Sequence, residues 1–290
     1  MKGQWAVMSG GPMIGKSTLA GELAGRLNDD EHRAILISLK DADPSNGTWP
    51  LFFEAVTRQG MSWNPKNPYR KNPVSLPDFM TQIHHIAEKM PPQQRSKKLI
   101  LLIDDCDSFF PQSEKLIPQI ANMAMELTDV PIHAICWIGG LAWDAWAREH
   151  PREFIIPLRF YPLSVVPIRE ARQIISDRMG PAQMEAVWND TGGHPYLMEQ
   201  TFGAENSTSV DALVKRIYAE LRPEEEALLD QLNPEGQWMP LEDLKNAEGN
   251  RPPKRLLDRL CMAGVMVRTL DHGTAVVRQT SPRLTFKQER

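Results

Sequence analysis

The chain has 290 residues, a formal net charge of −4 and a pI near 6.0. This length suffices for one large domain and a smaller one, and the nearly balanced charge excludes a nucleic-acid coat protein and a polybasic membrane tail. The first residues enter an apolar strand pattern without the basic and apolar regions of a secretory leader, and no apolar run approaches the ~20 residues that span a bilayer. We therefore expect a cytoplasmic protein with no membrane partner.

The first predicted elements are a strand, a glycine-rich turn and a helix. Trp5–Met8 is apolar and suits a buried strand. After the turn, Leu19, Leu23 and Leu27 recur every four residues and predict one apolar helix face. The turn itself, Gly10–Ser17, matches the P-loop pattern of two glycines four residues apart followed by lysine and serine.

A P-loop pattern has a clear chemical meaning. A loop built around glycines can aim successive backbone N–H groups at a polyphosphate, and the helix behind it adds the positive end of its dipole. Lys16 would reach the β- and γ-phosphates, the Ser17 hydroxyl would ligate Mg²⁺, and Thr18 would lie near the α-phosphate. A glycine-rich turn that matches by chance is the alternative. The predicted nucleotide-binding residues are Gly10, Gly11, Pro12, Met13, Ile14, Gly15, Lys16, Ser17 and Thr18.

The next elements continue an alternation of strands and helices. Residues 33–39 read as a strand buried on both faces, as in a parallel sheet. A short helix is expected at 50–58 and a longer one at 77–89. Between them, 60–77 is too rich in proline for regular structure. We expect a surface excursion there, either a partner-contact segment or a passive loop.

An apolar run that ends abruptly in acids supplies the second half of the site. Residues 98–103 form the apolar run, and Asp104 and Asp105 follow it. Because ligands sit at the carboxyl ends of strands in open α/β sheets, Asp104 is placed to hold Mg²⁺ opposite Ser17. Asp105 stands where a water-activating carboxylate would sit, but it is shorter than glutamate, so we expect slow or partner-dependent hydrolysis. The alternative is a strand end with solvated acids.

The middle of the chain adds one more helix and two strands to the predicted sheet. A helix is expected at 113–127, a strand at 132–138 ending in Gly139 and Gly140, and another strand at 154–160. The segment between the two strands is a predicted helix with Trp143 and Trp146 on one face. Packing is the simplest role for these tryptophans.

The last third of the sequence changes from alternating elements to helices followed by a hairpin. An Asp-x-Gly centre at 271–273 between two apolar runs is a hairpin signal. Three helices followed by a hairpin form the outline of a winged helix. The predicted helices are 168–178, 181–188, 195–202, 210–221, 223–232, 241–247 and 252–263.

A winged helix raises the question of DNA. Its presumed recognition helix carries Lys254, Arg255 and Arg259 against Asp258. Basic and acidic residues are equal in number over 206–290, whereas a DNA-binding surface normally has a net positive charge. DNA is therefore a possible partner that the sequence does not favour, and docking to a protein or to this chain itself is preferred.

Several of these motifs together resemble one family. The P-loop, the acid pair, the Tyr-Pro-Leu-Ser turn at 161–164 and the Gly-Gly-His-Pro sequence at 192–195 are similar to the AAA-like branch of P-loop ATPases. Within it, the chain is most similar to the signal-transduction ATPases with numerous domains (STAND) and the archaeal-type ATPases, over roughly residues 3–205. The resemblance implies a three-layer α/β/α parallel sheet in residues 1–162, a helical lid in 163–208 and a winged-helix domain in 209–290.

The resemblance also implies roles for residues outside the P-loop. In that family the Gly-x-Pro turn packs against the adenine, which assigns base contact to His194 and Pro195. A tight turn at the two glycines with Pro195 in the first helical position explains the same residues without nucleotide. Arg148 and Arg152 stand where an arginine finger reaches a neighbouring subunit's nucleotide. Solvated surface arginines are the other interpretation.

Two departures from the family pattern weaken the expected catalysis. The polar sensor that such ATPases place beside the γ-phosphate is replaced by Gly139 and Gly140, and few residues precede the first strand to cover the adenine. We therefore expect an ATP- and Mg²⁺-binding molecular switch with slow or partner-stimulated ATP hydrolysis, which couples nucleotide state to a protein partner or a homo-oligomer. The alternative is a nucleic-acid-associated regulator with a degenerate ATPase core. A small-molecule kinase is less consistent with the acid pair and the C-terminal pattern.

Overall fold

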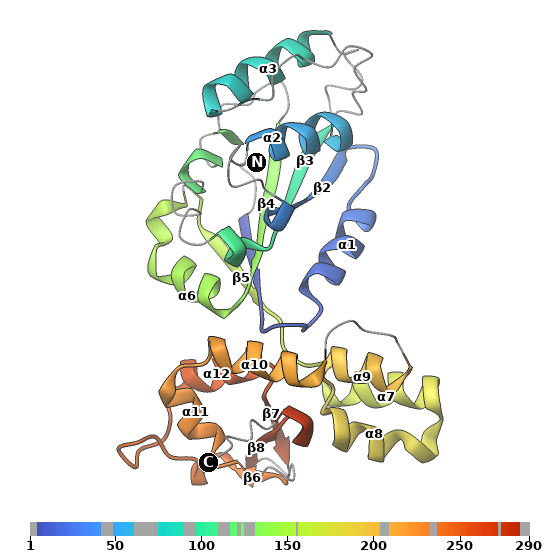
Figure 1. Ribbon diagram of the computed structural model, residues 1–290, viewed down its shortest axis with the longest axis vertical. Coiled ribbons are helices and arrows are strands. Elements are labelled where there is room, and N and C mark those ends of the chain that lie inside the picture. The colour runs from blue at the N-terminus through green and yellow to red at the C-terminus, as the bar shows by residue number, and fades with distance from the viewer. Residues whose placement is uncertain are drawn as a thin grey trace. The chain divides into compact units, whose positions relative to one another are not determined.

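In a computed structural model, the chain folds into two compact units (Figure 1). The first unit consists of Met1–Ser9 and Lys16–Tyr161, and the second consists of Gly10–Gly15 and Pro162–Arg290. Most of the predicted excursion at 60–77, most of the predicted helix at 113–127 and the hairpin tip at 272–273 lie outside the described residues. The described residues are 5–41, 49–60, 73, 75–89, 97–109, 117–120, 123–124, 131–154, 156–203, 209–232, 237–271 and 274–284.

The first unit is built on a five-stranded sheet with the order β2-β3-β4-β1-β5. The pairs β1–β4, β3–β4 and β2–β3 are parallel, as the apolar strand runs predicted. The register pairs Ser38 with Asp104 and Ser9 with Gly139, so the carboxyl ends of these four strands lie at one edge of the sheet. The strands are β1 (Trp5–Ser9), β2 (His32–Ser38), β3 (Lys98–Asp104), β4 (Ile132–Gly139) and β5 (Leu158–Pro162).

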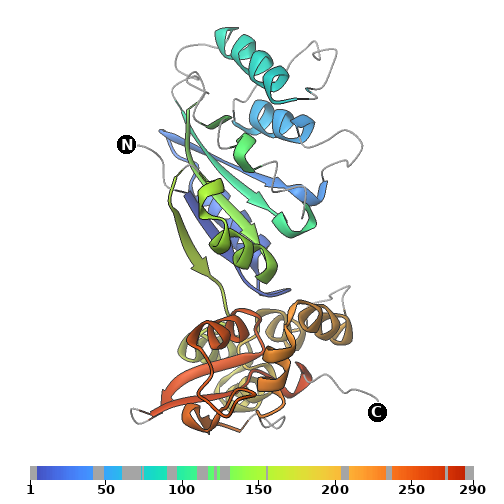
Figure 2. The ribbon, with the colours of Figure 1, turned by 90° about the vertical axis from the view of Figure 1, so that its left-hand side faces the viewer.

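Helices cover both faces of this sheet. The connection from β1 to β2 runs across the sheet in the opposite direction to that from β4 to β5, so right-handed crossovers put α1 and α6 on opposite faces, as Figure 2 shows. This arrangement is the predicted three-layer α/β/α fold. The helices are α1 (Lys16–Arg26), α2 (Trp49–Glu54), which continues as a π-helical turn at Ala55–Gly60, α3 (Leu76–Lys89) and α6 (Leu141–Glu149).

The two faces of the sheet are packed unequally. The main core includes Phe52 of α2, Phe79 of α3 and Trp137 of β4, each at most 1% exposed. On α1 only Ala20 is buried, and Leu19 is 38% exposed. Leu19, one of the three leucines predicted to share an apolar helix face, is therefore exposed, and the buried position of α1 is Ala20.

The second unit contains six helices in its described residues and a three-stranded sheet with the order β6-β8-β7. β7 and β8 pair antiparallel, which confirms the predicted hairpin. The predicted helix at 241–247 is only a short 3₁₀ turn, Leu241–Asp243. The elements are α7 (Ile168–Met179), α8 (Met184–Thr191), α9 (Pro195–Thr201), α10 (Val210–Glu220), α11 (Pro223–Leu229), α12 (Lys254–Met262), β6 (Met239–Pro240), β7 (Met266–Asp271) and β8 (Thr274–Gln279).

Side chains of β8 and of the turn that follows it contact α8 within the second unit. The Arg278 guanidinium of β8 lies 4.9 Å from the ring centre of Trp188 in α8 and 5.0 Å from that of Trp238. Arg283 adds an ion pair to Asp190 of α8 at 3.1 Å. Residues 163–208 and 209–290 therefore share one compact unit. Within the described ranges, no helix combines the length and apolar character needed to cross a bilayer.

Candidate functional site

The turn after β1 has the backbone shape that a phosphate-binding loop needs. Met13 and Gly15 both have left-handed φ angles, 57° and 92°. Left-handed residues in a tight turn let neighbouring N–H groups point into one concavity. A β-carbon on Gly15 would meet no atom within 4 Å, so the backbone angle, not space, favours glycine there. Met13 has a left-handed φ as well but carries a side chain, a strain that folded proteins retain mainly at functional turns.

Part of this loop is anchored within the second unit. Ile14 is 5% exposed and packs in an apolar cluster with Val165 and Val267. The N–H of Gly11 donates to the carbonyl oxygen of Met262, at the end of α12, at 2.6 Å. A β-carbon on Gly11 would lie 2.5 Å from the carbonyl oxygen of Ala263. This close backbone approach requires glycine and engages one amide of the predicted phosphate loop.

The remaining P-loop residues open α1 in the first unit. Lys16 is partly buried, and Ser17 and Thr18 are exposed. They occupy the first turn of an 11-residue helix, where backbone N–H groups have no partner inside the helix. The predicted phosphate and metal contacts of these side chains therefore start from the helix end that attracts anions.

Asp104, at the end of β3, is a buried carboxylate with little compensation. It is 4% exposed, and its Oδ1 accepts a hydrogen bond from the N–H of Asp105 at 2.8 Å. Among the residues that the structure describes, no lysine, arginine or histidine pairs with it. A buried anion without a countercharge is costly. Its position at the carboxyl edge of the sheet is suited to a bound cation.

Asp105 is held in an unusual conformation beside it. Its φ of 58° is left-handed, and Oδ2 accepts a hydrogen bond from the Ser38 hydroxyl of β2 at 2.8 Å. Aspartate tolerates this region better than most residues. The sequence analysis did not single out Ser38. Its place at the end of the strand next to the acids is the signal that could have identified it.

The neighbouring strand end, at Gly139 of β4, is filled by an aromatic side chain. A β-carbon at Gly139 would lie 2.7 Å from Cγ of Trp143, whose ring stacks on Trp146 with centres 5.2 Å apart. The predicted packing role of both tryptophans is thereby confirmed. Asp107 caps the start of α6 by accepting hydrogen bonds from the N–H groups of Gly140 and Trp143. A side chain at position 139 would therefore meet Trp143, which gives a physical reason for the glycine at this strand end.

The two predicted arginine fingers differ in their surroundings. Arg148 donates from Nε and Nη2 to the Asp144 carboxylate at 2.7 and 3.1 Å, and its guanidinium lies 4.0 Å from the ring centre of Phe160. Asp144 also accepts a hydrogen bond from the Ser9 hydroxyl at 2.8 Å. Arg152 is exposed in a short 3₁₀ turn. Arg148 would have to break a pair within its own chain to act elsewhere, whereas Arg152 extends from the surface.

His194 and Pro195, the predicted adenine contacts, lie at the start of α9. Pro195 takes the first helical position. His194 is fully buried, and neither ring nitrogen has a hydrogen-bond partner among the described residues. Burial lowers the pKa of His194 to about 4. A β-carbon on Gly264 would lie 3.1 Å from both the His194 ring and Ile14, so the neutral imidazole lies next to the residues that anchor the phosphate loop.

Comparisons with known proteins support the fold. No family model matches the sequence, and no curated protein matches it. A Walker-type ATPase of Pyrococcus abyssi superposes with a TM-score of 0.54 at 12% identity, over 97% of this chain and 89% of that one.

Two more distant solved structures also match. The Orc1 protein of Aeropyrum pernix, in complex with DNA, has a TM-score of 0.45 at 12% identity, over 98% of this chain and 85% of that one. A RuvB point mutant of Thermotoga maritima has a TM-score of 0.36 at 14% identity, over 92% and 82%. Only the Pyrococcus abyssi protein has a TM-score above 0.5 among these three structures, and at 12% identity this similarity supports a shared fold and nothing more. The chain therefore has the fold of a Walker-type P-loop ATPase.

Proposed function

We propose that this protein binds ATP with Mg²⁺ and works as a molecular switch with slow or partner-stimulated hydrolysis. The observation that carries the proposal is the buried Asp104 at the carboxyl edge of a P-loop-type sheet, which pairs with no cation among the residues that the structure describes. The left-handed angles of the glycine-rich turn at Met13 and Gly15 add the shape of a phosphate-binding loop. Phosphate and cation are the two ligands that these features suit.

The residues present fit a magnesium ion. Ser17 and Asp104 offer a hydroxyl and a carboxylate, which are the hard oxygen donors that Mg²⁺ prefers. Mg²⁺ usually keeps several waters and takes one or two protein oxygens plus substrate phosphates, so a large protein cage is unnecessary. Among the described residues, no cluster of three or more metal-binding side chains occurs. The bound ion would neutralise phosphate charge, and Lys16 would hold the β- and γ-phosphates.

Weak hydrolysis follows from the surroundings of Asp105 and Gly139. One carboxylate oxygen of Asp105 already accepts a hydrogen bond from Ser38, and a catalytic base must reach its water at hydrogen-bond distance. Gly139 cannot carry a polar side chain without displacing Trp143. Positioning of the attacking water would therefore be incomplete unless a partner supplied the missing group.

The hydrogen bond between Gly11 and Met262 suggests how nucleotide state could be coupled to the second unit. A phosphate that recruits the Gly11 N–H must take it from the Met262 carbonyl. The same turn next to α12 also carries the close approach of Ala263. Binding would thus be linked to a rearrangement of α12, a ligand-driven change of the kind that P-loop switches use.

The first test is nucleotide affinity. Lys16→Ala should weaken binding of Mg-ATP at least tenfold, since hydrogen bonds to charged groups are worth ~1.5–3 kcal/mol. Lys215→Ala, which removes an exposed lysine of α10, is the matched control and should bind as wild type does. Isothermal titration of the full chain measures both. Equal affinity of wild type and Lys16→Ala would refute the proposal.

An oligomeric ATPase is a variant of this proposal. Arg152 is the better candidate for a finger acting in trans, because Arg148 is paired with Asp144. Mixing Arg152→Ala subunits with Asp105→Ala subunits should restore part of the turnover that each lacks alone. If the mixture stays as inactive as its components, Arg152 does not act on the nucleotide of a neighbouring subunit.

A nucleic-acid-associated regulator that uses the winged helix is the alternative. Lys254 and Arg255 are exposed on α12, but Arg259 is buried in an ion pair with Glu225, and Arg268 pairs with Asp258 at 3.0 Å. Less positive charge is therefore available for phosphates than the sequence indicated. A duplex DNA titration at low salt tests it, and Lys254→Ala with Arg255→Ala should weaken any binding uniformly across sequences.

A further inference from the structure

Two histidines come together at the amino edge of the sheet in the first unit. His32 begins β2 and His133 is the second residue of β4, while β3 lies between these two strands. The centres of the two imidazole rings are 5.1 Å apart, and the ring planes are tilted by 49°. The rings are therefore close neighbours that do not lie face to face.

This spacing suits one metal ion shared by the two rings. With the ion ~2.1 Å from each ligating nitrogen and a tetrahedral angle between the two bonds, the ring centres lie about 5 Å apart. Imidazole nitrogen is a common ligand of zinc, copper and nickel, whereas Mg²⁺ prefers oxygen. The distance between the rings thus fits a zinc-type ion.

A carboxylate orients the first ring. Nδ1 of His32 lies 3.2 Å from both carboxylate oxygens of Asp29. Oδ1 of Asp29 also accepts hydrogen bonds from the N–H groups of His32 and Glu31, which hold the carboxylate in place and keep its pKa below the usual value. Because an ionised carboxylate only accepts, Nδ1 carries the proton and a neutral ring keeps its lone pair on Nε2. Carboxylates orient metal-ligating histidines in this way.

The surroundings of the second ring keep it neutral. Burial lowers the pKa of His133 below 6.5, and the nearby charges of His32 and Lys98 lower it further. A metal ligand must be unprotonated, so this shift favours binding. Lys98 itself repels a cation, although the Glu31 carboxylate 3.6 Å from its Nζ offsets part of that charge. Removing this lysine should therefore strengthen the binding of a metal ion.

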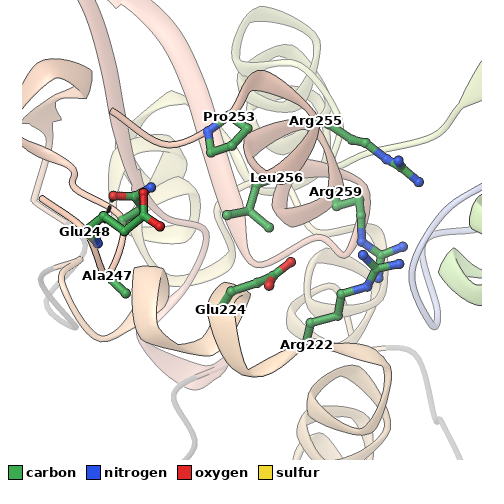
Figure 3. A pocket seen from close by; sticks show the side chains of 9 residues that line it. Arg222, Glu224, Ala247, Glu248, Pro253, Arg255, Leu256 and Arg259 are labelled. Atoms are coloured by element: carbon green, nitrogen blue, oxygen red, sulfur yellow. Dashed lines mark hydrogen bonds between the residues drawn. The ribbon is translucent and has the colours of Figure 1, made fainter. Parts of the chain in front are cut away.

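The charged pocket of the second unit is a poorer place for such an ion. It has a volume of about 410 Å³ and lies at the start of α11 and α12, where Glu224 and Glu248 line it (Figure 3). Arg222, Arg255 and Arg259 line the same pocket and oppose a cation. Carboxylate oxygens also suit magnesium and calcium better than zinc. The histidine pair is therefore the better zinc candidate of the two.

We propose that His32 and His133 bind one zinc ion, with Asp29 behind His32 and water at the remaining positions. Water is needed because no third metal-binding side chain joins the two rings in the part of the chain that the structure describes. The ion would join β2 to β4 across the amino end of β3. Asp104 ends the same seven-residue strand, so the zinc and the proposed Mg²⁺ lie about 20 Å apart. The zinc site is thus independent of the nucleotide switch.

The test is calorimetric titration of the full chain with Zn²⁺ in excess Mg²⁺, after circular dichroism has shown that each variant is folded. His32→Gln and His133→Gln should each abolish the binding heat. Asp29→Asn should weaken binding about tenfold, as expected for a group that orients a ligand. Lys98→Gln should strengthen binding, a direction that a disturbed fold would not produce. His150→Gln, at an exposed histidine after α6, is the matched control and should bind zinc as wild type does.

Three results would overturn the zinc site. The first is a wild-type chain that binds no Zn²⁺, and the second is binding that both histidine variants retain. The third is binding that Glu224→Gln abolishes, which would assign the ion to the pocket. Asp29→Asn and Lys98→Gln keep the test decisive if a histidine variant does not fold. Lys16→Ala should bind Zn²⁺ as wild type does, so failure of the nucleotide proposal and failure of this one give different results.

Discussion

Two aspartates of the first unit are equally buried but differ in the partners of their carboxylates. Asp104 and Asp144 are each 4% exposed. Asp144 is paired by Arg148 and also accepts a hydrogen bond from Ser9, so its charge is compensated within the chain. Asp104 accepts one backbone N–H and pairs with no cation among the described residues. The first arrangement stabilises the fold, and the second is suited to a charge that arrives with a ligand.

The two adjacent strand ends show the same division. At the end of β3, Asp105 keeps a left-handed backbone angle and a carboxylate held by Ser38. At the end of β4, Gly139 leaves its space to Trp143. A strained backbone is kept where a ligand is expected, and close packing takes the place of polar side chains one strand away.

The largest effect is expected at His194, a buried imidazole whose ring nitrogens find no hydrogen-bond partner in the part of the chain that the structure describes. Because its pKa is lowered from 6.5 to about 4, the unfolded chain takes up a proton below pH 6.5 while the folded chain does not. Stability should therefore fall by about 3 kcal/mol as the pH drops from about 6.5 to about 4. Urea unfolding across this range should show a shallower dependence in His194→Gln, and an unchanged dependence would contradict this.

Breaking the compensated pair should cost nearly as much. Asp144→Asn leaves Arg148 without its countercharge, and since Arg148 is partly exposed we expect a loss of about 2–3 kcal/mol. The free energy of unfolding in urea measures it. Glu153→Gln, which removes an exposed acid from the 3₁₀ turn that follows α6, is the control and should lie within ~0.5 kcal/mol of wild type. If Asp144→Asn changed the free energy of unfolding as little as the control does, the Asp144–Arg148 pair would not be compensating a buried charge.

Adding a side chain at the closed strand end should have a smaller effect. Gly139→Ser must displace Trp143, and overpacking of this kind costs ~1–3 kcal/mol. Gly21→Ser, at a helix position with no atom within 4 Å of its β-carbon, is the matched control and should not destabilise. Thermal unfolding distinguishes the two. If Gly139→Ser were as stable as its control, Trp143 would not be what excludes a sensor side chain.

The smallest effect on stability is expected at Asp104. Asp104→Asn keeps the shape and removes a buried charge that no cation of the described residues pairs with, so without metal and nucleotide its stability should equal or exceed that of wild type. The measurement is urea unfolding in the presence of a chelator, side by side with Asp144→Asn. A loss as large as that of Asp144→Asn would show that Asp104 is paired in the fold after all.

Motifs that are determined by neighbouring residues could be predicted from the sequence. The P-loop, the acids after an apolar strand, the sheet-forming strands and the C-terminal hairpin each depend on neighbouring residues, and the structure contains the corresponding elements. The predicted strand at 154–160 is shifted, since β5 begins at Leu158. Apolar residues before it were counted as strand although Phe154 packs in the core instead.

Contacts between residues that are far apart in the chain could not be predicted from the sequence. Ser38 and Asp105 are 67 positions apart, and Ser9 and Asp144 are 135 apart. The contact of Gly11 with Met262 joins opposite ends of the chain. Such pairs follow from strand order and packing, which no local pattern states. For the same reason the sequence suggested Arg148 as a finger without revealing its partner.

The central claim is that a divalent cation completes the site at Asp104, and Mg²⁺-dependent nucleotide binding tests it most directly. ATP affinity should be measured by calorimetry with Mg²⁺ and with a chelator for wild type, Asp104→Asn and Asp144→Asn. We predict that Mg²⁺ strengthens ATP binding by wild type and by folded Asp144→Asn but has little effect on Asp104→Asn. Equal Mg²⁺ dependence in Asp104→Asn and wild type would contradict the account.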